Sequence, residues 1–185
     1  MRKSKKASSK SGQRGFLKNN LRVVVDTHLL ANAAQASLEK HPHDASAAES
    51  LRLFEEILHV CSRVVLAVPQ QREAWGNAPA QLRGAGHRLQ IGASPVLAAL
   101  EGKGKLLRPA ASVIPKLSQQ DQKPLRGKGH KRKITDDVHL YETAAQYDRI
   151  VITQDPAQHY SAGRMLRRLG VRVVNVQTAL GPSRG

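Results

Sequence analysis

The amino-acid sequence predicts an α/β fold: a three-layer α/β/α sandwich around a mostly parallel central sheet. Short runs rich in valine and isoleucine alternate with segments in which apolar residues recur at helical spacing. This alternation is typical of parallel sheets that are covered by helices on both faces. The strand-like runs are almost continuously apolar, as expected of strands that are buried on both sides.

The composition limits the class of protein further. A chain of 185 residues has the length of one domain, and only 3% of its residues are aromatic, so its core must be built from Val, Leu, Ile and Ala. Cys61 is the only cysteine, which excludes an intrachain disulfide and indicates a reducing, cytoplasmic location. No apolar run approaches the ~20 residues that a membrane span requires, so a membrane partner is not expected.

The net charge of +16 is concentrated in two segments. Residues 1–20 carry seven Lys or Arg and no acid, whereas residues 101–133 carry ten Lys or Arg and two acids, which leaves a net charge of +1 for the rest. We therefore expect a basic, disordered tail over 1–20 and a domain over 21–180 with a basic loop near 101–133. Such charge favours a polyanionic partner, above all RNA; the alternative is that the basic segments only keep the protein soluble.

In the first half of the domain, residues 21–25 (LRVVV) form a predicted strand that ends at Asp26, and residues 29–38 a helix. Asp44 to Ser46, with Glu49, signals the start of the next helix, and the pair Ser46 and Glu49 has the spacing of a capping box. The predicted buried face of that helix consists of Ala48, Leu51, Phe54, Ile57, Leu58 and Cys61. Residues 63–68 form a second strand, and a helix follows from residue 70.

In the second half, residues 93–100 are expected to be helical and residues 105–107 to form a short edge strand. Residues 115–133 are rich in Gly, Pro and Lys, which indicates a long loop. A helix is then predicted over 137–147, a strand over 149–153, a helix with a strongly basic face over 156–169, and a last strand over 171–176.

Acidic residues occur where these elements meet. Asp26, Glu73 and Asp155 follow the carboxyl ends of three predicted strands, and Asp137 opens a helix. Ligands of open parallel sheets bind at that edge, where the strand order reverses. Carboxylates crowded there repel one another unless a cation offsets their charge, and oxygen ligands suit Mg²⁺ or Mn²⁺. Such a metal can activate water for attack on a phosphodiester.

Each acid also has a simpler explanation. Asp155 precedes Pro156 and would serve as a helix N-cap. Asp137 would cap its helix or favour its dipole, Glu73 would be a solvated helix residue, and Asp26 would be a cap. It is their shared placement that favours a metal site.

These residues resemble the PIN-domain family. VVVDTHLL (residues 23–30) is similar to its opening strand and acidic motif, with His28 where asparagine is usual, and VVLAVPQQREAW (64–75) is similar to its second strand and its glutamate helix. DVHLYETAAQYDRIVITQD (137–155) matches best, with an eighteen-residue step between its two terminal aspartates. The resemblance covers about residues 21–78 and 134–177.

The resemblance implies a PIN-like sandwich and a Mg²⁺- or Mn²⁺-dependent, often endonucleolytic ribonuclease. It implies that Asp26, Glu73, Asp137 and Asp155 are catalytic and hold the metal, and relatives include toxins with an antitoxin partner, homodimers, and RNA-processing enzymes. Thr27 and Thr153 flank this site and would orient a carboxylate or a metal-bound water. The residues expected to contact RNA are basic: Lys128, Lys131, Arg132, Lys133, Arg164, Arg167 and Arg168.

Two other hypotheses stay open. The chain would be a catalytically weak or inactive RNA-binding or assembly factor if the basic segments carry the function. DNA also stays open as a substrate, because neither charge nor carboxylates distinguish a 2′-hydroxyl.

Overall fold

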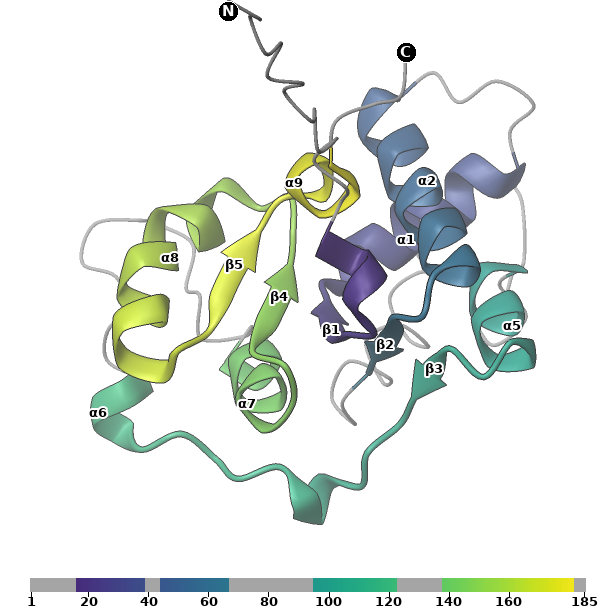
Figure 1. Cartoon of the computed structure of the whole chain (residues 1–185). Helices are drawn as coiled ribbons and strands as arrows, with labels where there is room; N and C mark the ends of the chain where they lie inside the picture. The colour runs from purple at the N-terminus through teal and green to yellow at the C-terminus, as the bar shows by residue number, and fades with distance from the viewer. Residues whose placement is uncertain (1–15, 39–43, 67–94, 123–137, 182–185) are drawn as a thin grey trace, which may run out of the picture.

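A computed structural model describes residues 16–38, 44–66, 95–122 and 138–181 (Figure 1). The strands are β1 (Arg22–Val25), β2 (Arg63–Val65), β3 (Leu106–Leu107), β4 (Ile150–Ile152) and β5 (Arg172–Val174). They form one sheet in the order β3-β2-β1-β4-β5, and every neighbouring pair is parallel. The predicted α/β sandwich with a parallel sheet is thus confirmed.

The chain builds the sheet outward from β1 in two directions. From β1 it moves through β2 to β3 at one edge, then returns to the other side of β1 to form β4 and β5. The strand order therefore reverses between β1 and β4. In open α/β sheets this reversal opens a crevice at the carboxyl ends of the two strands.

One face of the sheet is covered by four of the described helices, most of them over β1 and β2. They are α1 (Thr27–Leu38), α2 (Ala45–His59), α5 (Pro95–Gly102) and α9 (Val176–Leu180), with the 3₁₀ turn η1 (Phe16–Asn19) beside them. Alternate residues of a strand point to opposite faces, so Val23 and Val25 of β1 enter this layer. They pack there against Leu29, Phe54, Ile57 and Leu100.

The opposite face is covered by α7 (Val138–Gln146) and α8 (Pro156–Leu169). Val24 of β1 points to this side, together with Val65 and Val151. The residues that α7 and α8 bring to this second core include Leu140, Tyr141, Ala144 and Met165. Between β3 and α7 lie the short turns η3 (Ala111–Val113) and α6 (Gln119–Gln122).

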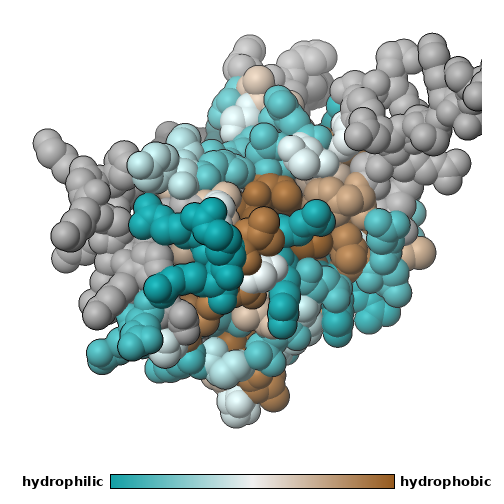
Figure 2. All heavy atoms as spheres, turned by 60° about the vertical axis from the view of Figure 1, so that its left-hand side comes forward, coloured by the Kyte–Doolittle hydropathy of each residue, from teal (hydrophilic) through white to brown (hydrophobic). Residues whose placement is uncertain are grey.

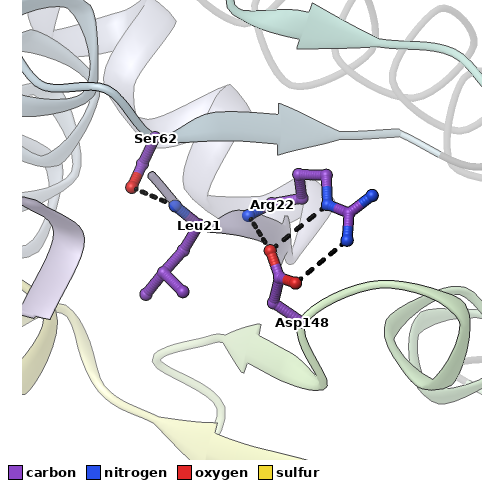
Figure 3. Close-up of polar contacts among 4 residues, drawn as sticks. All are labelled: Leu21, Arg22, Ser62 and Asp148. Atoms are coloured by element: carbon purple, nitrogen blue, oxygen red, sulfur yellow. Dashed lines mark hydrogen bonds and ion pairs between the residues drawn. The ribbon is translucent and has the colours of Figure 1, made fainter. Parts of the chain in front are cut away.

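Polar contacts fix the amino ends of the central strands (Figure 3). Asp148, in the turn before β4, accepts hydrogen bonds from the backbone N–H of Arg22 at 2.6 Å and from Nη2 of its guanidinium at 3.1 Å. The Arg22 side chain also lies 5.3 Å from the centre of the Tyr147 ring. On the other side, the buried hydroxyl of Ser62 accepts from the N–H of Leu21 at 3.0 Å.

Helix α2 starts at the predicted signal, but it is capped in a different way. Its N-cap is Asp44, whose carboxylate accepts from the backbone N–H of Ser46, so the predicted capping box of Ser46 and Glu49 is wrong. The side chains of Ser46 and Glu49 instead bond to Gln154, beyond β4. The two side chains that would form the local cap are thus used in a tertiary contact with Gln154.

The buried face of α2 is also shifted from the predicted one. The residues that it buries are Ala47, Ser50, Leu53, Phe54 and Ile57. Ala48, Leu51 and Leu58 are partly buried, and Cys61 is exposed beyond the end of the helix rather than on an apolar face. Only Phe54 and Ile57 are common to both sets, because the helix packs against α1, α5 and α9.

Other element boundaries agree in part. Helix α8 has the predicted bounds, and β3 is the predicted edge strand. The tail predicted over 1–20 contains the ordered turn η1, whose Leu17 is buried, and the loop predicted over 115–133 contains α6. The last strand ends at Val174, and α9 follows it. None of the described helices is long and apolar enough to cross a membrane.

Candidate active site

Two of the predicted acids lie where the strand order reverses. Asp26 directly follows β1, and its N–H donates to the carbonyl of Ile152 in β4 at 3.0 Å. Asp155 lies three residues beyond the end of β4. The sheet therefore delivers both aspartates to the carboxyl edge of its two adjacent central strands.

Thr153 connects these two residues. Its hydroxyl donates to Asp26 Oδ2 at 2.8 Å and accepts from the backbone N–H of Asp155 at 3.0 Å. The Thr153 residue is 0% exposed. A buried hydroxyl that both donates and accepts has a fixed direction, so it orients the Asp26 carboxylate and the loop that carries Asp155.

Behind Asp26, a second polar chain comes from the other helical layer. Gln158 is 0% exposed, and its side-chain Nε2 donates to Asp26 Oδ2 at 3.3 Å. Its Oε1 accepts from the hydroxyl of the buried Tyr141 at 3.3 Å. Tyr141 on α7 thus sets the orientation of the Gln158 amide, and the amide presents its donor group to the carboxylate. Asp26 Oδ2 therefore receives two hydrogen bonds from buried neutral side chains.

The other carboxylate oxygen of Asp26 is hydrogen-bonded to the first turn of α1. Asp26 Oδ1 accepts from the backbone N–H of His28 at 3.1 Å. The exposed His28 offers this main-chain group to the carboxylate, and Thr27 is the first residue of α1. Asp26 is thus a local cap, as the simpler explanation predicts, and its other oxygen is the end point of the buried network.

Asp155 is also a helix cap. Its Oδ1 accepts from the N–H of Ala157 at 2.8 Å, and Pro156 occupies the first turn, so it is the N-cap of α8 as the simpler explanation predicted. Its other oxygen, Oδ2, makes no hydrogen bond to any described residue. Capping therefore uses only one of its two carboxylate oxygens and leaves the second available to a ligand.

Gln154, between Thr153 and Asp155, attaches the end of β4 to α2 and α9. Its Oε1 accepts from the hydroxyls of Ser46 at 2.8 Å and Ser50 at 3.3 Å. Its Nε2 donates at 3.4 Å to Glu49, whose carboxylate also accepts from Gln177 at 2.9 Å. This cluster holds the 153–155 segment from the α2 side while Gln158 holds it from the α8 side.

The remaining predicted acids, Glu73 and Asp137, lie outside the described residues. So do the predicted RNA contacts of the basic loop: Lys128, Lys131, Arg132 and Lys133. Within the described ranges, no group of three or more His, Cys, Asp or Glu side chains is gathered as a metal site. Asp26 and Asp155 are therefore the part of the predicted acidic site whose geometry is described.

The oxygen atoms of Asp26 and Asp155 suit a hard divalent cation. Both charged groups offer carboxylate oxygen, and the groups fixing Asp26 are neutral amides and hydroxyls that leave its negative charge uncompensated. Mg²⁺ is commonly held by one or two carboxylates and keeps several waters. Asp26 and Asp155 are the residues that would hold such an ion.

The predicted basic face of α8 lies away from these aspartates. Arg164, Arg167 and Arg168 are exposed and follow Asp155 by nine to thirteen residues, which is about 14–20 Å along a helix that rises 1.5 Å per residue. Arg168 Nη1 also donates to the carbonyl of Gln120 at 2.7 Å. These arginines can contact phosphates of a nucleic acid that extends along α8, but not a phosphate bound at Asp26.

Sequence reasoning missed Gln158, Tyr141 and Gln154. Gln158 is a polar residue on the buried side of α8, one turn before Ala162 and two turns before Met165. A lone amide among apolar residues gives no indication of its partner. Gln154 gave no signal at all, since its partners lie more than 100 positions earlier in the chain.

The chain matches no family model and no curated protein.

Proposed function

We propose that this chain is a divalent-metal-dependent ribonuclease that hydrolyses RNA phosphodiester bonds, acting as a toxin or as an RNA-processing enzyme. The observation that carries the proposal is the pairing of Asp26 and Asp155 through Thr153 at the reversal of strand order. Binding sites of α/β sheets occur at this position. The similarity of the strand ends to the PIN-domain family supports the same reaction.

The chemistry assigned to these residues is electrostatic. Asp26 and Asp155, with Glu73 and Asp137 as further ligands, bind Mg²⁺ or Mn²⁺. A bound ion of this kind lowers the pKa of a coordinated water and stabilises negative charge on phosphate oxygens. Thr153 and Gln158 keep Asp26 Oδ2 in a fixed direction, so that little reorganisation is needed when substrate binds.

The basic segments supply affinity for RNA. Residues 1–20 and 101–133 carry most of the net charge, and phosphate contacts made by Lys and Arg strengthen binding by releasing condensed counterions. Deleting residues 1–14 should weaken RNA binding and flatten its dependence on salt. It should leave η1, which begins at Phe16, in place.

The decisive experiment compares two aspartates that cap helices. Asp155→Asn and Asp44→Asn both keep a good N-cap, but only Asp155 lies beside Asp26. Purified protein would be incubated with a mixed pool of single-stranded and structured RNA in Mg²⁺, Mn²⁺ or EDTA. Metal-dependent cleavage should fall at least 100-fold in Asp155→Asn and stay unchanged in Asp44→Asn.

Other outcomes distinguish the alternatives. RNA binding with no cleavage under any metal, in wild type and variants alike, would favour a non-catalytic RNA-binding factor. Equal cleavage by wild type and Asp155→Asn would refute the site assignment. Running the same assay on DNA of identical sequence tests the substrate preference.

A further inference from the structure

A groove lies at the opposite edge of the sheet from β3, along the last strand. It has a volume of about 450 Å³ and is open to solvent. The residues that line it come from η1, β4, α8, β5 and α9: Phe16, Ile150, Ala162, Gly163, Leu166, Arg172, Val173, Val174 and Thr178. Figure 2 shows apolar atoms exposed across this side of the molecule between hydrophilic ones. Leu166, in its wall, is 51% exposed.

The floor of the groove contains an unpaired strand edge. The N–H of Arg172 donates to Arg149 and the carbonyl of Val174 accepts from Thr153, so these two residues face β4. Successive residues of a strand point their N–H and C=O groups to opposite sides, and those of Val173 face outward. No described strand pairs with β5 on that side. Val173 thus offers one donor and one acceptor to a segment lying in the groove.

The segment of the chain that supplies most of the groove lining carries positive charge and no negative charge. Residues 156–181, which form α8, β5 and α9, contain four arginines and no acid. Arg172 lines the groove, and Arg167 lies beside its Gly163 wall, with Nη1 3.7 Å from the position that a Cβ on Gly163 would take. A second copy of this chain would place the same arginines opposite one another across a twofold axis. The basic tail would be repelled for the same reason.

Gly163 has no packing role that requires glycine. It lies inside α8, where glycine costs about 1 kcal/mol relative to alanine, and a Cβ there would contact only the flexible end of Arg167. Because Gly163 has no side chain, the groove stays open beside β5.

We propose that this groove binds an extended peptide segment of a partner protein in which acidic and apolar residues alternate, and that the segment pairs with β5 as an added strand. Because alternate residues of a strand point to opposite faces, its apolar side chains contact Phe16 and Val174 on one face, and its carboxylates meet Arg167 of α8 on the other. Its backbone bonds to Val173. Strand addition of this kind takes its affinity from main-chain bonds and its specificity from side chains. This site is separate from Asp26 and Asp155 of the proposed nuclease site, and it shares Arg167 with the basic face of α8.

The test uses a fluorescein-labelled peptide of seven residues that alternates glutamate with valine. Its binding to the full chain is measured by fluorescence anisotropy, beside a control peptide in which lysine replaces every glutamate. We expect the glutamate peptide to bind at least tenfold more tightly. Hydrogen exchange of the Val173 amide, followed by NMR, should slow on binding because that N–H becomes bonded.

A pair of glycine variants locates the site. Gly163→Met fills the groove without a backbone penalty and should weaken peptide binding at least tenfold. Gly102→Met, at the exposed end of α5 where a Cβ meets nothing within 4 Å, is the matched control and should leave binding unchanged. Because Gly163→Met should fold at least as stably as wild type, a loss of binding cannot be attributed to unfolding.

Four results would overturn the proposal. Equal affinity for both peptides would show that charge does not select the partner. Unchanged affinity in Gly163→Met would show that the peptide does not bind in the groove. A dimer in sedimentation that dissociates in Gly163→Met would make a second copy the occupant. An RNA oligonucleotide that displaces the peptide, and that itself binds less tightly to Gly163→Met, would make the occupant a nucleic acid.

Discussion

The hydroxyl of Thr153 lies 2.8 Å from Asp26 Oδ2 and donates a hydrogen bond to it across the two central strands. The two residues are 127 positions apart in sequence, yet each is placed by the strand that it follows. The same hydroxyl accepts from the N–H of Asp155. One buried side chain therefore sets the geometry between both aspartates of the candidate site.

Replacing Thr153 with valine keeps its shape and removes this hydroxyl. Asp26 loses a donor and the Asp155 N–H loses its acceptor, so the free energy of unfolding should fall by about 1–3 kcal/mol. If the site is a nuclease, cleavage should fall at least tenfold, whereas Thr153→Ser, which keeps the hydroxyl, should retain most of it. Urea unfolding and a cleavage assay measure the two effects.

Ser62→Ala is the control for the two Thr153 variants. It also removes a buried hydroxyl that bonds to the backbone, but at the amino end of the sheet. It should reduce stability by a comparable amount and leave cleavage unchanged. A parallel loss of cleavage in Ser62→Ala would mean that the Thr153 effect reflects stability alone.

Gln158→Glu should be more damaging than its small change in shape suggests. The substitution replaces the donor 3.3 Å from Asp26 Oδ2 with a second carboxylate in a fully buried position. Two like charges would face each other without water, so the free energy of unfolding at neutral pH should fall by at least about 2 kcal/mol. Wild-type stability in urea for this variant would contradict the described network.

The contact between Asp148 and Arg22 predicts a specific pH dependence. Hydrogen bonds from the Arg22 guanidinium hold the pKa of Asp148 below its ordinary value of 3.8. Since the folded-state pKa is lowered, the stabilisation is fully present above pH 3.8 and is lost as the pH falls below it.

Asp148→Asn tests that dependence. The pair is partly exposed, so the substitution should reduce stability by only about 1 kcal/mol at pH 7. The difference between wild type and Asp148→Asn in urea unfolding should shrink as the pH falls from 4 to 2. A difference that grows over this range would have the wrong sign for a lowered pKa.

Two glycines of the α8 region should respond to alanine in opposite directions. Gly170, the C-cap, has a φ of 67°, and a Cβ there would lie 2.9 Å from Arg149 Nη1. Gly170→Ala should cost about 1–2 kcal/mol, whereas Gly163→Ala should gain up to about 1 kcal/mol because it lies within the helix. Thermal unfolding of both variants checks the order.

Part of this molecule follows from local sequence alone. Helix α8 has its predicted bounds because Asp155, Pro156 and Gly170 are strong start and stop signals within the segment itself. The parallel sheet follows from apolar runs alternating with helical patterns. The position of Asp26 at a strand end follows from the run of valines before it.

Tertiary structure decided what no local pattern contains. Local spacing predicts a capping box of Ser46 and Glu49, but both side chains bond to Gln154, more than 100 residues away. The order β3-β2-β1-β4-β5 puts β4 beside β1, and this pairing brings Thr153 and Gln158 within reach of Asp26. Local sequence determines where a helix or strand can begin and end, because capping and periodicity act over a few residues. Which polar groups meet in the core depends on which strands pair, because a buried donor must find its acceptor wherever the fold places it.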